Sequence, residues 1–387
     1  MTITPDIRYI GVDDPGQHLF ESQYATPDGM CYNSYVVLDE KIAVLDTSDS
    51  RTLEQWKANL RQVLGDRQPD YLIVQHLEPD HASGIADICA LYPNMQIVCS
   101  AKALQMMPQY FEDDTLGTRV QTVKEGDTLT LGRHVLRFIM APMVHWPEVM
   151  VTYDEADHVL FSADGFGKFG VYEADADDWA CEARRYYFNI CGKYGQPVST
   201  LLKKAAALDI QQILPLHGPV LAGEKLAEAL RLYTIWSSYG VETEGVFVAH
   251  ASIHGNTAAA AARLVEILKQ KGCPKVAVCD LCRDDLAEAV EDAFRYGRMV
   301  CMASSYDAGV FPPMYDFLHH LDIKAYQRRR VALVENGSWA PSAAKTMRPM
   351  LEGMKQVEVV DPIVTLRGRL KDSDLPQLEA LADTILA

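Results

Sequence analysis

Four side chains that can bind a metal ion lie within the six-residue segment His76-Leu77-Glu78-Pro79-Asp80-His81. The segment directly follows the apolar run 71–74, which is predicted to form a buried strand. A strand fixes the backbone, and the turn after it lets alternate side chains converge on one point. Carboxylates beside the imidazoles make such a site hard and anionic, which favours iron or manganese over zinc. The segment therefore predicts a hard metal site at the end of this strand.

Three further candidate ligands also stand where a predicted strand gives way to a loop. His145 follows the segment 141–144, Asp164 follows 159–163, and His217 follows 213–216. A binuclear centre needs such distant partners, because each metal must gain several ligands and share a bridge. The remaining histidines outside the loop described next lack this placement and are predicted to be surface or packing residues: His18, His134, His158, His250, His319 and His320.

A second candidate site begins at a polar loop between a predicted buried strand (245–250) and a predicted helix (258–270). Backbone N–H groups, the positive end of the helix dipole and hydroxyl groups together can cradle a phosphate there. The loop consists of Ser252, Ile253, His254, Gly255, Asn256 and Thr257. Placed on the first strand of a doubly wound sheet, it resembles the FMN phosphate loop of flavodoxins.

Two later strand ends supply candidates for a flavin ring pocket, since ligands of such sheets bind at the switch point beyond the carboxyl ends of the strands. The first comprises Ser304, Ser305, Tyr306, Asp307, Ala308 and Gly309, and the second Asn336, Gly337, Ser338 and Trp339. Trp339 could instead be a core residue. The first loop departs from the Ser-Pro-Thr sequence usual in flavodoxin-like domains.

Predicted strands and helices position these residues, and their order along the chain changes near residue 240. The N-terminal part has many predicted strands separated by helices, which indicates an α/β or sandwich-like architecture. From residue 245 onward, strands at 276–279, 299–302 and 331–334 alternate with helices, which predicts a doubly wound parallel sheet. We therefore expect an α/β protein with domains at 1–243 and 244–387.

Composition narrows the possible functions. The 387 residues carry a formal net charge of −17, which argues against binding nucleic acid. No apolar run approaches the ~20 residues that cross a bilayer, and the N-terminus lacks a signal peptide, so we expect no membrane association. Nine scattered cysteines suit free thiols in a reducing cytoplasm. The pair Cys279 and Cys282 is expected to pack without a metal, and Arg328–Arg330 is expected to be a solvated turn.

The complete ligand series resembles that of the flavodiiron proteins, also called A-type flavoproteins. The resemblance rests on the His-x-Glu-x-Asp-His opening followed by His145, Asp164 and His217, and it extends over essentially the whole chain. A zinc hydrolase of the metallo-β-lactamase type would carry histidine in place of Glu78. Further segments that resemble the family are 29–35, 161–167 and 186–190.

The resemblance implies a metallo-β-lactamase-like αββα sandwich followed by a flavodoxin-like domain, with FMN and two iron ions (Fe2+/Fe3+) as cofactors. It implies that His76, Glu78 and His145 bind one iron, that Asp80 and His217 bind the other, and that Asp164 bridges the two. His81 is either a further ligand or a residue that orients Asp80.

The implied function is that of an oxidoreductase, which passes electrons through FMN to a diiron site that reduces O2 to water, NO to N2O, or both. The implied electron donor is a separate rubredoxin, with reduced coenzyme F420 as the alternative. The implied assembly is a head-to-tail homodimer, or a dimer of such dimers. Two other functions stay open: a zinc hydrolase fused to a flavodoxin module, and a purely electron-transferring flavoprotein.

Overall fold

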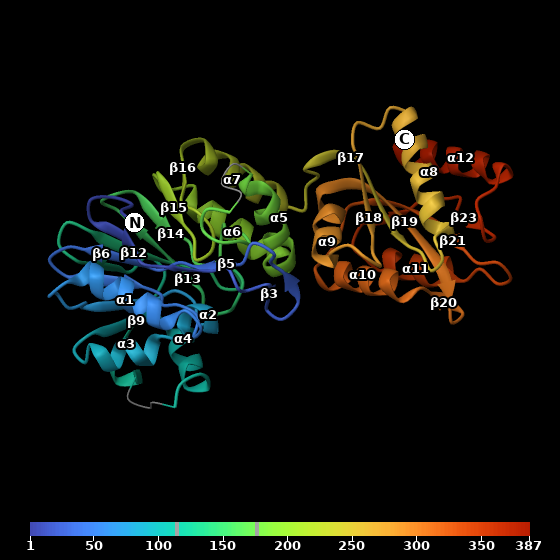
Figure 1. The fold of residues 1–387 in the computed structure, drawn as a ribbon. Coiled ribbons are helices and arrows are strands. Elements are labelled where there is room, and N and C mark those ends of the chain that lie inside the picture. The colour runs from blue at the N-terminus through green and yellow to red at the C-terminus, as the bar shows by residue number, and fades with distance from the viewer. Residues whose placement is uncertain (113–115, 175–177) are drawn as a thin grey trace. The chain divides into compact units, whose positions relative to one another are not determined.

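The computed structural model describes residues 1–112, 116–174 and 178–387 and contains two compact units. The first unit comprises Met1–Tyr187 and Tyr194–Thr234, and the second comprises Phe188–Lys193 and Ile235–Ala387. Figure 1 shows both units along the coloured chain.

The first unit is built around two six-stranded sheets. The strands of the first sheet, in spatial order, are β1 (Ile7–Tyr9), β6 (Tyr35–Leu38), β7 (Ile42–Leu45), β8 (Tyr71–Val74), β9 (Gln96–Ser100) and β10 (Val120–Val123). Those of the second are β11 (Thr128–Thr130), β12 (Val135–Met140), β13 (Met150–Asp154), β14 (Val159–Phe161), β15 (Gln212–Leu214) and β16 (Leu221–Ala222). Buried side chains from both sheets, among them Tyr35, Phe138 and Phe161, form one core between them.

Helices cover the outer faces of these sheets (Figure 1). On the first sheet, α1 (Leu53–Leu64) and α3 (Ile85–Leu91) pack over a second core. Trp56, Leu60 and Leu64 recur every four residues along α1, so the buried side chains form one stripe that faces the sheet. The other helices before residue 240 are α2 (Pro79–Ala82), α4 (Ala101–Met106), α5 (Trp179–Ile190), α6 (Gly195–Ala205) and α7 (Gly223–Ser237), with 3-10 turns at η1 (Met107–Gln109), η2 (Leu116–Arg119) and η3 (Gly192–Tyr194). The last residues of α5 and α7 and most of η3 are counted with the second unit. The predicted αββα sandwich is thereby confirmed.

Strand direction explains why the metal-binding segment lies where it does. Strands β7, β8 and β9 are parallel, so their carboxyl ends share one edge of the first sheet. The segment that begins at His76 leaves β8 at this edge. Two small ribbons, β2 (Val12–Asp14) with β5 (Met30–Tyr32) and β3 (Leu19–Phe20) with β4 (Tyr24–Ala25), complete the unit.

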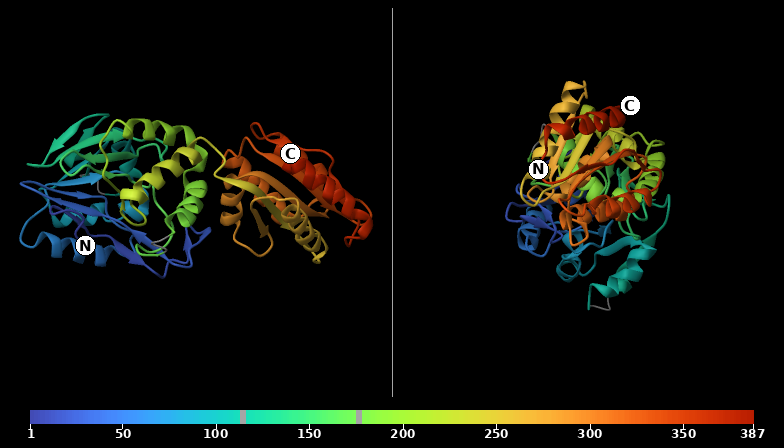
Figure 2. Two further views of the ribbon diagram at one scale, coloured as in Figure 1. Left: turned by 90° about the horizontal axis from the view of Figure 1, so that it is seen from above. Right: turned by 90° about the vertical axis from the view of Figure 1, so that its right-hand side faces the viewer.

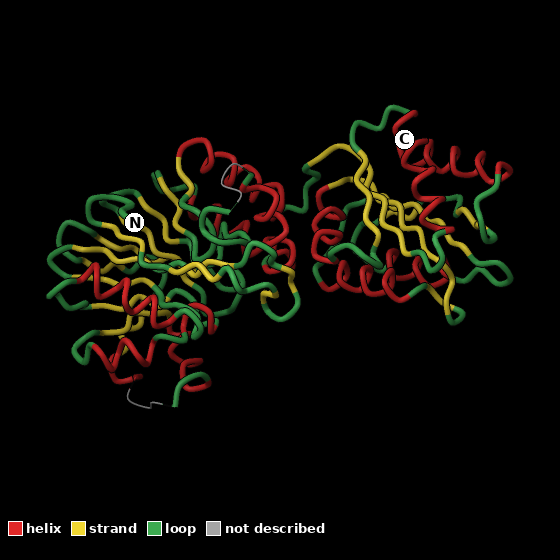
Figure 3. The backbone as a smooth tube through the Cα atoms, viewed as in Figure 1, coloured by secondary structure: helices red, strands yellow, loops and turns green. Residues whose placement is uncertain are grey.

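The second unit has one sheet with parallel strands in the order β18-β17-β19-β21-β22. Its strands are β17 (Thr243–Ala251), β18 (Val276–Asp280), β19 (Tyr296–Tyr306), β20 (Gly309–Val310), β21 (Arg330–Asn336), β22 (Glu358–Val359) and β23 (Val364–Leu366). Its helices are α8 (Asn256–Gln270), α9 (Leu286–Arg295), α10 (Pro312–Ile323), α11 (Ala343–Glu352) and α12 (Leu375–Leu386), with η4 (Asp372–Asp374). Figures 2 and 3 show α8 and α12 side by side, away from α9 to α11 across the sheet. This is the predicted doubly wound arrangement.

One prediction about this unit is wrong. Arg329 is not part of a solvated turn: it is 2% exposed, and its guanidinium donates hydrogen bonds to six backbone carbonyls. These carbonyls include those of Tyr239 and Gly240 on one side and Phe294 and Tyr296 on the other. Arg329 therefore links the segment before β17 to the junction between α9 and β19 inside the second unit. A basic triplet in the sequence does not indicate such a buried role. None of the helices in the described ranges has the length and apolar character needed to cross a membrane.

Candidate functional site

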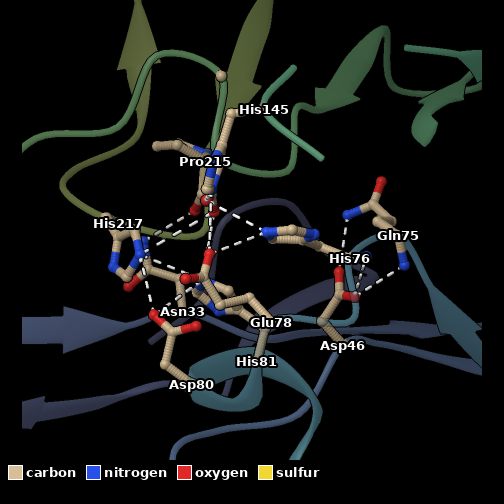
Figure 4. Close-up of polar contacts among 12 residues, drawn as sticks. Asn33, Asp46, Gln75, His76, Glu78, Asp80, His81, His145, Pro215 and His217 are labelled. Atoms are coloured by element: carbon tan, nitrogen blue, oxygen red, sulfur yellow. Dashed lines mark hydrogen bonds and ion pairs between the residues drawn. The ribbon is translucent and has the colours of Figure 1, made fainter. Parts of the chain in front are cut away.

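The first group of candidate ligands gathers around Glu78. Its Oε2 lies 3.1 Å from Nε2 of His76 and 3.0 Å from Nε2 of His145. His76 leaves the end of β8, whereas His145 comes from the loop between β12 and β13 in the other sheet. Figure 4 shows these side chains pointing toward one another. Together with Asp164, the three residues offer ligand atoms that all lie within 4.8 Å of one another.

The second group lies beside the first and contains Asp80, His81 and His217. Nε2 of His81 lies 3.1 Å from Nε2 of His217, and Oδ2 of Asp80 lies 3.3 and 3.4 Å from these two nitrogens. The single turn α2 carries Asp80 and His81, and backbone and hydroxyl hydrogen bonds from Thr47 to the His81 carbonyl fix that turn. The turn holds His81 so that Nε2 of its imidazole points at the other donors of this group.

Asp164 joins the two groups. Its Oδ2 lies 3.1 Å from His145 and 3.5 Å from His76, while its Oδ1 lies 3.2 Å from His81 and 4.0 Å from His217. The residue follows β14 in a tight turn, in which the Ser162 hydroxyl donates to the Gly165 carbonyl at 2.6 Å. One carboxylate thus directs one oxygen to each group, which is the geometry of a bridging ligand.

The donor set fits two metal ions. Donors bound at about 2.1 Å to one ion stand about 3.0–3.4 Å apart, and the neighbouring donors within each group are 3.0 to 3.5 Å apart. Both carboxylate oxygens of Asp80 are buried and lack a hydrogen bond to the described residues. Buried carboxylate oxygens without donors are costly unless a cation neutralises them.

Residues around the groups orient the imidazoles. Nδ1 of His76 lies 2.8 Å from Oε1 of the fully buried Glu148, and Nδ1 of His217 lies 2.7 Å from the Cys31 carbonyl. These contacts leave Nε2 of both rings to face the centre. Asn33 donates to two carbonyls of the loop that carries His217, at 2.8 and 2.7 Å (Figure 4).

The same contacts shift the pKa values of the ligands. Burial alone lowers the pKa of His145, but the carboxylates of Asp164 and Glu78 outweigh it and raise that pKa to about 9. Burial likewise lowers the pKa of His81, and the carboxylates of Asp80 and Asp164 raise it to about 9. Without metal the carboxylates therefore attract protons onto the imidazoles. Metal ions must displace these protons, so metal affinity is expected to fall as the pH falls.

A pocket of about 330 Å³ opens onto the ligands. It is lined by apolar or aromatic residues such as Leu19, Phe20 and Tyr32 and by several carboxylates. Glu21 is exposed to solvent at the wall of this pocket, but partial desolvation there, followed by the charge of Glu78, raises its pKa to about 7 in the metal-free protein. The acidic lining residues are Glu21, Asp49, Glu78 and Asp80, with Arg51 as the basic one.

The predicted flavin residues of the second unit line one cavity of about 560 Å³. It lies where β17, β19 and β21 end, beside the start of α8. The predicted residues that line it are Ser252, Ile253, His254, Asn256, Ser304, Ser305, Tyr306, Asp307, Ala308, Asn336, Gly337, Ser338 and Trp339. Gly255, Thr257 and Gly309 adjoin these residues without lining the cavity. Trp339 is 90% exposed, so the alternative that it is a core residue is wrong.

The N-terminus of α8 fits a phosphate. Helix α8 begins at Asn256, directly after Gly255 with φ +86°, and like several other helices of the described ranges it has no side-chain cap. The first N–H groups of α8 therefore remain available to an anion. The Thr257 and Ser304 hydroxyls lie 2.9 Å apart and link the loop to the next strand.

Some functional candidates were not predicted from the sequence. Glu148 and Glu21 touch or face the metal-ligand groups, and Ser342 and Gly368 line the flavin cavity. No local motif marks them, because each is brought into place by contacts distant in sequence. His134, predicted to be a packing or surface residue, is fully buried between the carboxylates of Asp154 and Asp6, at 2.9 and 3.3 Å. Among the free thiols, Cys279 is buried and Cys282 is exposed.

The fold and the two sites define a class: a β-lactamase-like sandwich with a binuclear donor set, joined to a flavodoxin-like unit with a nucleotide-sized cavity. Comparisons with known proteins agree with this class. Residues 30–218 match the model of the ODP family beta lactamase.

Related proteins and solved structures cover most of the chain. The anaerobic nitric oxide reductase flavorubredoxin of Escherichia coli is 26% identical over 91% of this chain and 75% of its own length. The rubredoxin oxygen:oxidoreductase of Desulfovibrio gigas superimposes with a TM-score of 0.92, at 23% identity, over 100% of this chain and 97% of its own. The flavodiiron protein of Giardia intestinalis gives the same TM-score and identity, over 99% and 95%. The chain thus has the fold of the flavodiiron proteins along its whole length, and the resemblance predicted from the sequence is confirmed.

Proposed function

We propose that this chain is a flavodiiron oxidoreductase, which takes electrons through FMN and reduces O2 to water, NO to N2O, or both. The observation that carries the proposal is Asp164, whose two oxygens face two adjacent ligand groups, one of them centred on Glu78. The relatives support the same chemistry: the protein of E. coli is named a nitric oxide reductase, and that of D. gigas an oxygen oxidoreductase.

In this proposal His76, Glu78 and His145 hold one iron, and Asp80 and His217 hold the other, with Asp164 between them. His81 is proposed as a further ligand of the second iron, since its Nε2 lies among the other donors of that group. The iron pair, when bound, supplies electrons to a diatomic molecule, and FMN, when bound, passes on electrons received from a donor.

The side chains around the metal-ligand groups of the first unit favour small neutral molecules as substrates. Phe20, Tyr32 and Tyr186 surround the imidazole of His217 with ring centroids 5.5 to 5.9 Å away, which limits the access of water. The carboxylates around the pocket disfavour anionic substrates, and Arg51 is already engaged by Asp49 and Asp14. This charge pattern argues against hydrolysis of an anionic substrate, the chemistry of the zinc alternative.

Reduction of O2 or NO consumes protons, and Glu21 is proposed to deliver them. Its carboxyl lines the pocket together with Glu78 and Asp80 and is exposed to solvent, so it can carry protons from the surface to the ligand groups. Substituting Glu21 by glutamine is expected to slow turnover and to remove one ionisation from its pH profile.

The cavity of the second unit is proposed to bind FMN, with the phosphate at Ser252–Thr257 and the flavin ring against Tyr306 and Trp339. The indole of Trp339 is exposed in the isolated chain. A head-to-tail homodimer, or a dimer of such dimers, is proposed as the assembly, with rubredoxin or reduced coenzyme F420 as electron donor. The free cysteines support a reducing cytoplasm as the location. We propose domains at 1–243 and 244–387, close to the division between the compact units.

Anaerobic stopped-flow spectroscopy tests the function. Reduced, iron-loaded protein is mixed with O2 or with NO, and reoxidation of FMN is followed by its absorbance. Glu78→Ala and His217→Ala should abolish reoxidation coupled to O2 or NO consumption while FMN stays bound and reducible. His319→Ala, at an exposed position on α10, is the matched control. Full oxidase and NO reductase turnover in both ligand variants would refute the assignment.

A further inference from the structure

Three aromatic rings lead from the first metal-ligand group to the protein surface. The indole of Trp146 meets the imidazole of His76 edge to face, with centroids 5.2 Å apart at 89°. The ring of Tyr110 stacks on the same indole at 6.3 Å and 29°. Both separations lie within the about 4.5–7 Å range of aromatic pairs in direct contact.

The exposure of these three rings to solvent increases from His76 through Trp146 to Tyr110. His76 is fully buried, Trp146 is partly buried, and Tyr110 is 41% exposed. Trp146 follows the ligand His145 directly in the chain, and its ring also meets that imidazole at 6.2 Å. One indole thus touches two histidines of the same ligand group. Tyr110 comes from a different segment, just after η1, so the row is a tertiary arrangement.

Packing alone does not account for Tyr110. An aromatic side chain stabilises a fold mainly through the apolar area that it buries, and this ring leaves much of its area in water. Tyrosine and tryptophan are, however, side chains that can be oxidised by one electron under physiological conditions. A row of both types, ending at a metal ligand, suits one-electron transfer better than it suits stability.

We infer that Trp146 and Tyr110 form an electron relay that protects the metal site when the supply of electrons from FMN fails. The inference rests on the proposed function, because that function supplies the oxidant. Trp146 gives one electron toward the oxidised site and becomes a radical cation. Tyr110 reduces it by one electron and releases its phenolic proton to solvent. A thiol in solution then returns a hydrogen atom, one electron with one proton, to the Tyr110 radical and is itself oxidised to a disulfide after pairing with a second thiyl radical.

The test uses Tyr110→Phe, which keeps the ring and removes the oxidisable phenol. Because Tyr110 is 41% exposed and the variant keeps its ring, the variant should fold. Tyr315→Phe is the matched control, since Tyr315 is 52% exposed and lies in the second unit. Each iron-loaded protein receives hydrogen peroxide without a reductant, in the presence of a nitroso spin trap, and adducts are located by peptide mass spectrometry.

We expect wild type and Tyr315→Phe to carry a spin-trap adduct on Tyr110, and Tyr110→Phe to carry none there but more oxidation on Trp146 and on the ligand histidines. With O2 and a limiting donor, Tyr110→Phe should start at the wild-type rate and complete several-fold fewer turnovers before inactivation. Peroxide bypasses O2 reduction, so failure of the proposed function appears separately, as wild type that consumes neither O2 nor NO. Absence of an adduct on Tyr110 in wild type, or equal oxidation of the ligand histidines in wild type and Tyr110→Phe, overturns the relay.

Discussion

The contact between Glu148 and His76 allows a quantitative prediction about metal affinity. Oε1 of Glu148 accepts the N–H of Leu77 at 2.9 Å and lies 2.8 Å from Nδ1 of His76, and all three groups are buried. Hydrogen bonds to a charged partner contribute about 1.5–3 kcal/mol, whereas those between neutral groups contribute about 0.5–1.5 kcal/mol. Glu148→Gln keeps the shape and removes the charge, so it should cost about 1.4 kcal/mol, a tenfold loss of affinity at the first ligand group. Glu148→Ala also leaves the Leu77 N–H unpaired and should cost up to about 100-fold.

Calorimetric titration of the metal-free protein with Fe2+ under anaerobic conditions, or with Mn2+, measures these affinities group by group. Only the first group, which contains His76, should weaken, while the group of Asp80 and His217 should keep its affinity. Glu125→Gln is the matched control, because Glu125 is a surface carboxylate of the same unit, paired with Lys204. If Glu148→Gln binds both ions as tightly as wild type, or weakens both groups equally, then Glu148 does not act by orienting His76.

Three other predictions follow from the same structure. Asp164→Asn should reduce the metal content from two ions towards one or none, as measured by elemental analysis, because both groups lose the shared charge; two tightly bound ions in the variant would contradict a bridging role. Burial lowers the pKa of His134 but the two carboxylates that hold it raise that pKa above 6.5. Protonated His134 therefore stabilises the fold fully below its unfolded-state pKa, and this stabilisation is lost as the pH rises through its folded-state pKa. His134→Gln should lower the free energy of unfolding, measured in urea, by about 1.5 kcal/mol at pH 5 and by less at pH 9. A Cβ added at Gly337 would lie 2.8 Å from the Ser305 hydroxyl, so Gly337→Ala should weaken FMN binding about tenfold in fluorescence titration, and unchanged affinity would place the flavin elsewhere.

The strands that carry the metal ligands could be predicted from the sequence because their burial is nearly complete. Residues 71–74 and 159–161 are continuous apolar runs, and the structure has strands with these bounds. Parallel pairing of β7 to β9 and of β14 with β15 brings the strand ends before His76, Asp164 and His217 to one edge of each sheet, whereas His145 lies in the loop between the antiparallel strands β12 and β13. The flavin loop was predictable for the same reason, since β17 is buried over most of its length and α8 follows directly.

The residues around the ligands could not be predicted, since no local pattern specifies them. Glu148 reaches His76 across 72 positions, and Arg329 reaches Tyr239 across 90. Each is a single polar residue whose surroundings come from the tertiary fold. The stacking of Tyr110 on Trp146 likewise joins a 3-10 turn to a loop of the other sheet. The ligands at a strand end can be predicted from the sequence, whereas the distant side chains that contact them depend on the tertiary fold.

The carboxylate at position 78 has an electrostatic consequence that connects the site with its proposed chemistry. The ligand groups contain three carboxylates, those of Glu78, Asp80 and Asp164. With four neutral imidazoles, two divalent ions would give a net charge of +1 and two trivalent ions a net charge of +3. A histidine at position 78 would raise both values by one. Since an uncompensated charge in a buried site is costly, and the cost rises steeply with its size, Glu78 lowers the free energy needed to reach the more oxidised state. A hydrolytic site, whose metal charge stays constant, has no such requirement. Glutamate in place of histidine at position 78 therefore favours a site that cycles between oxidation states.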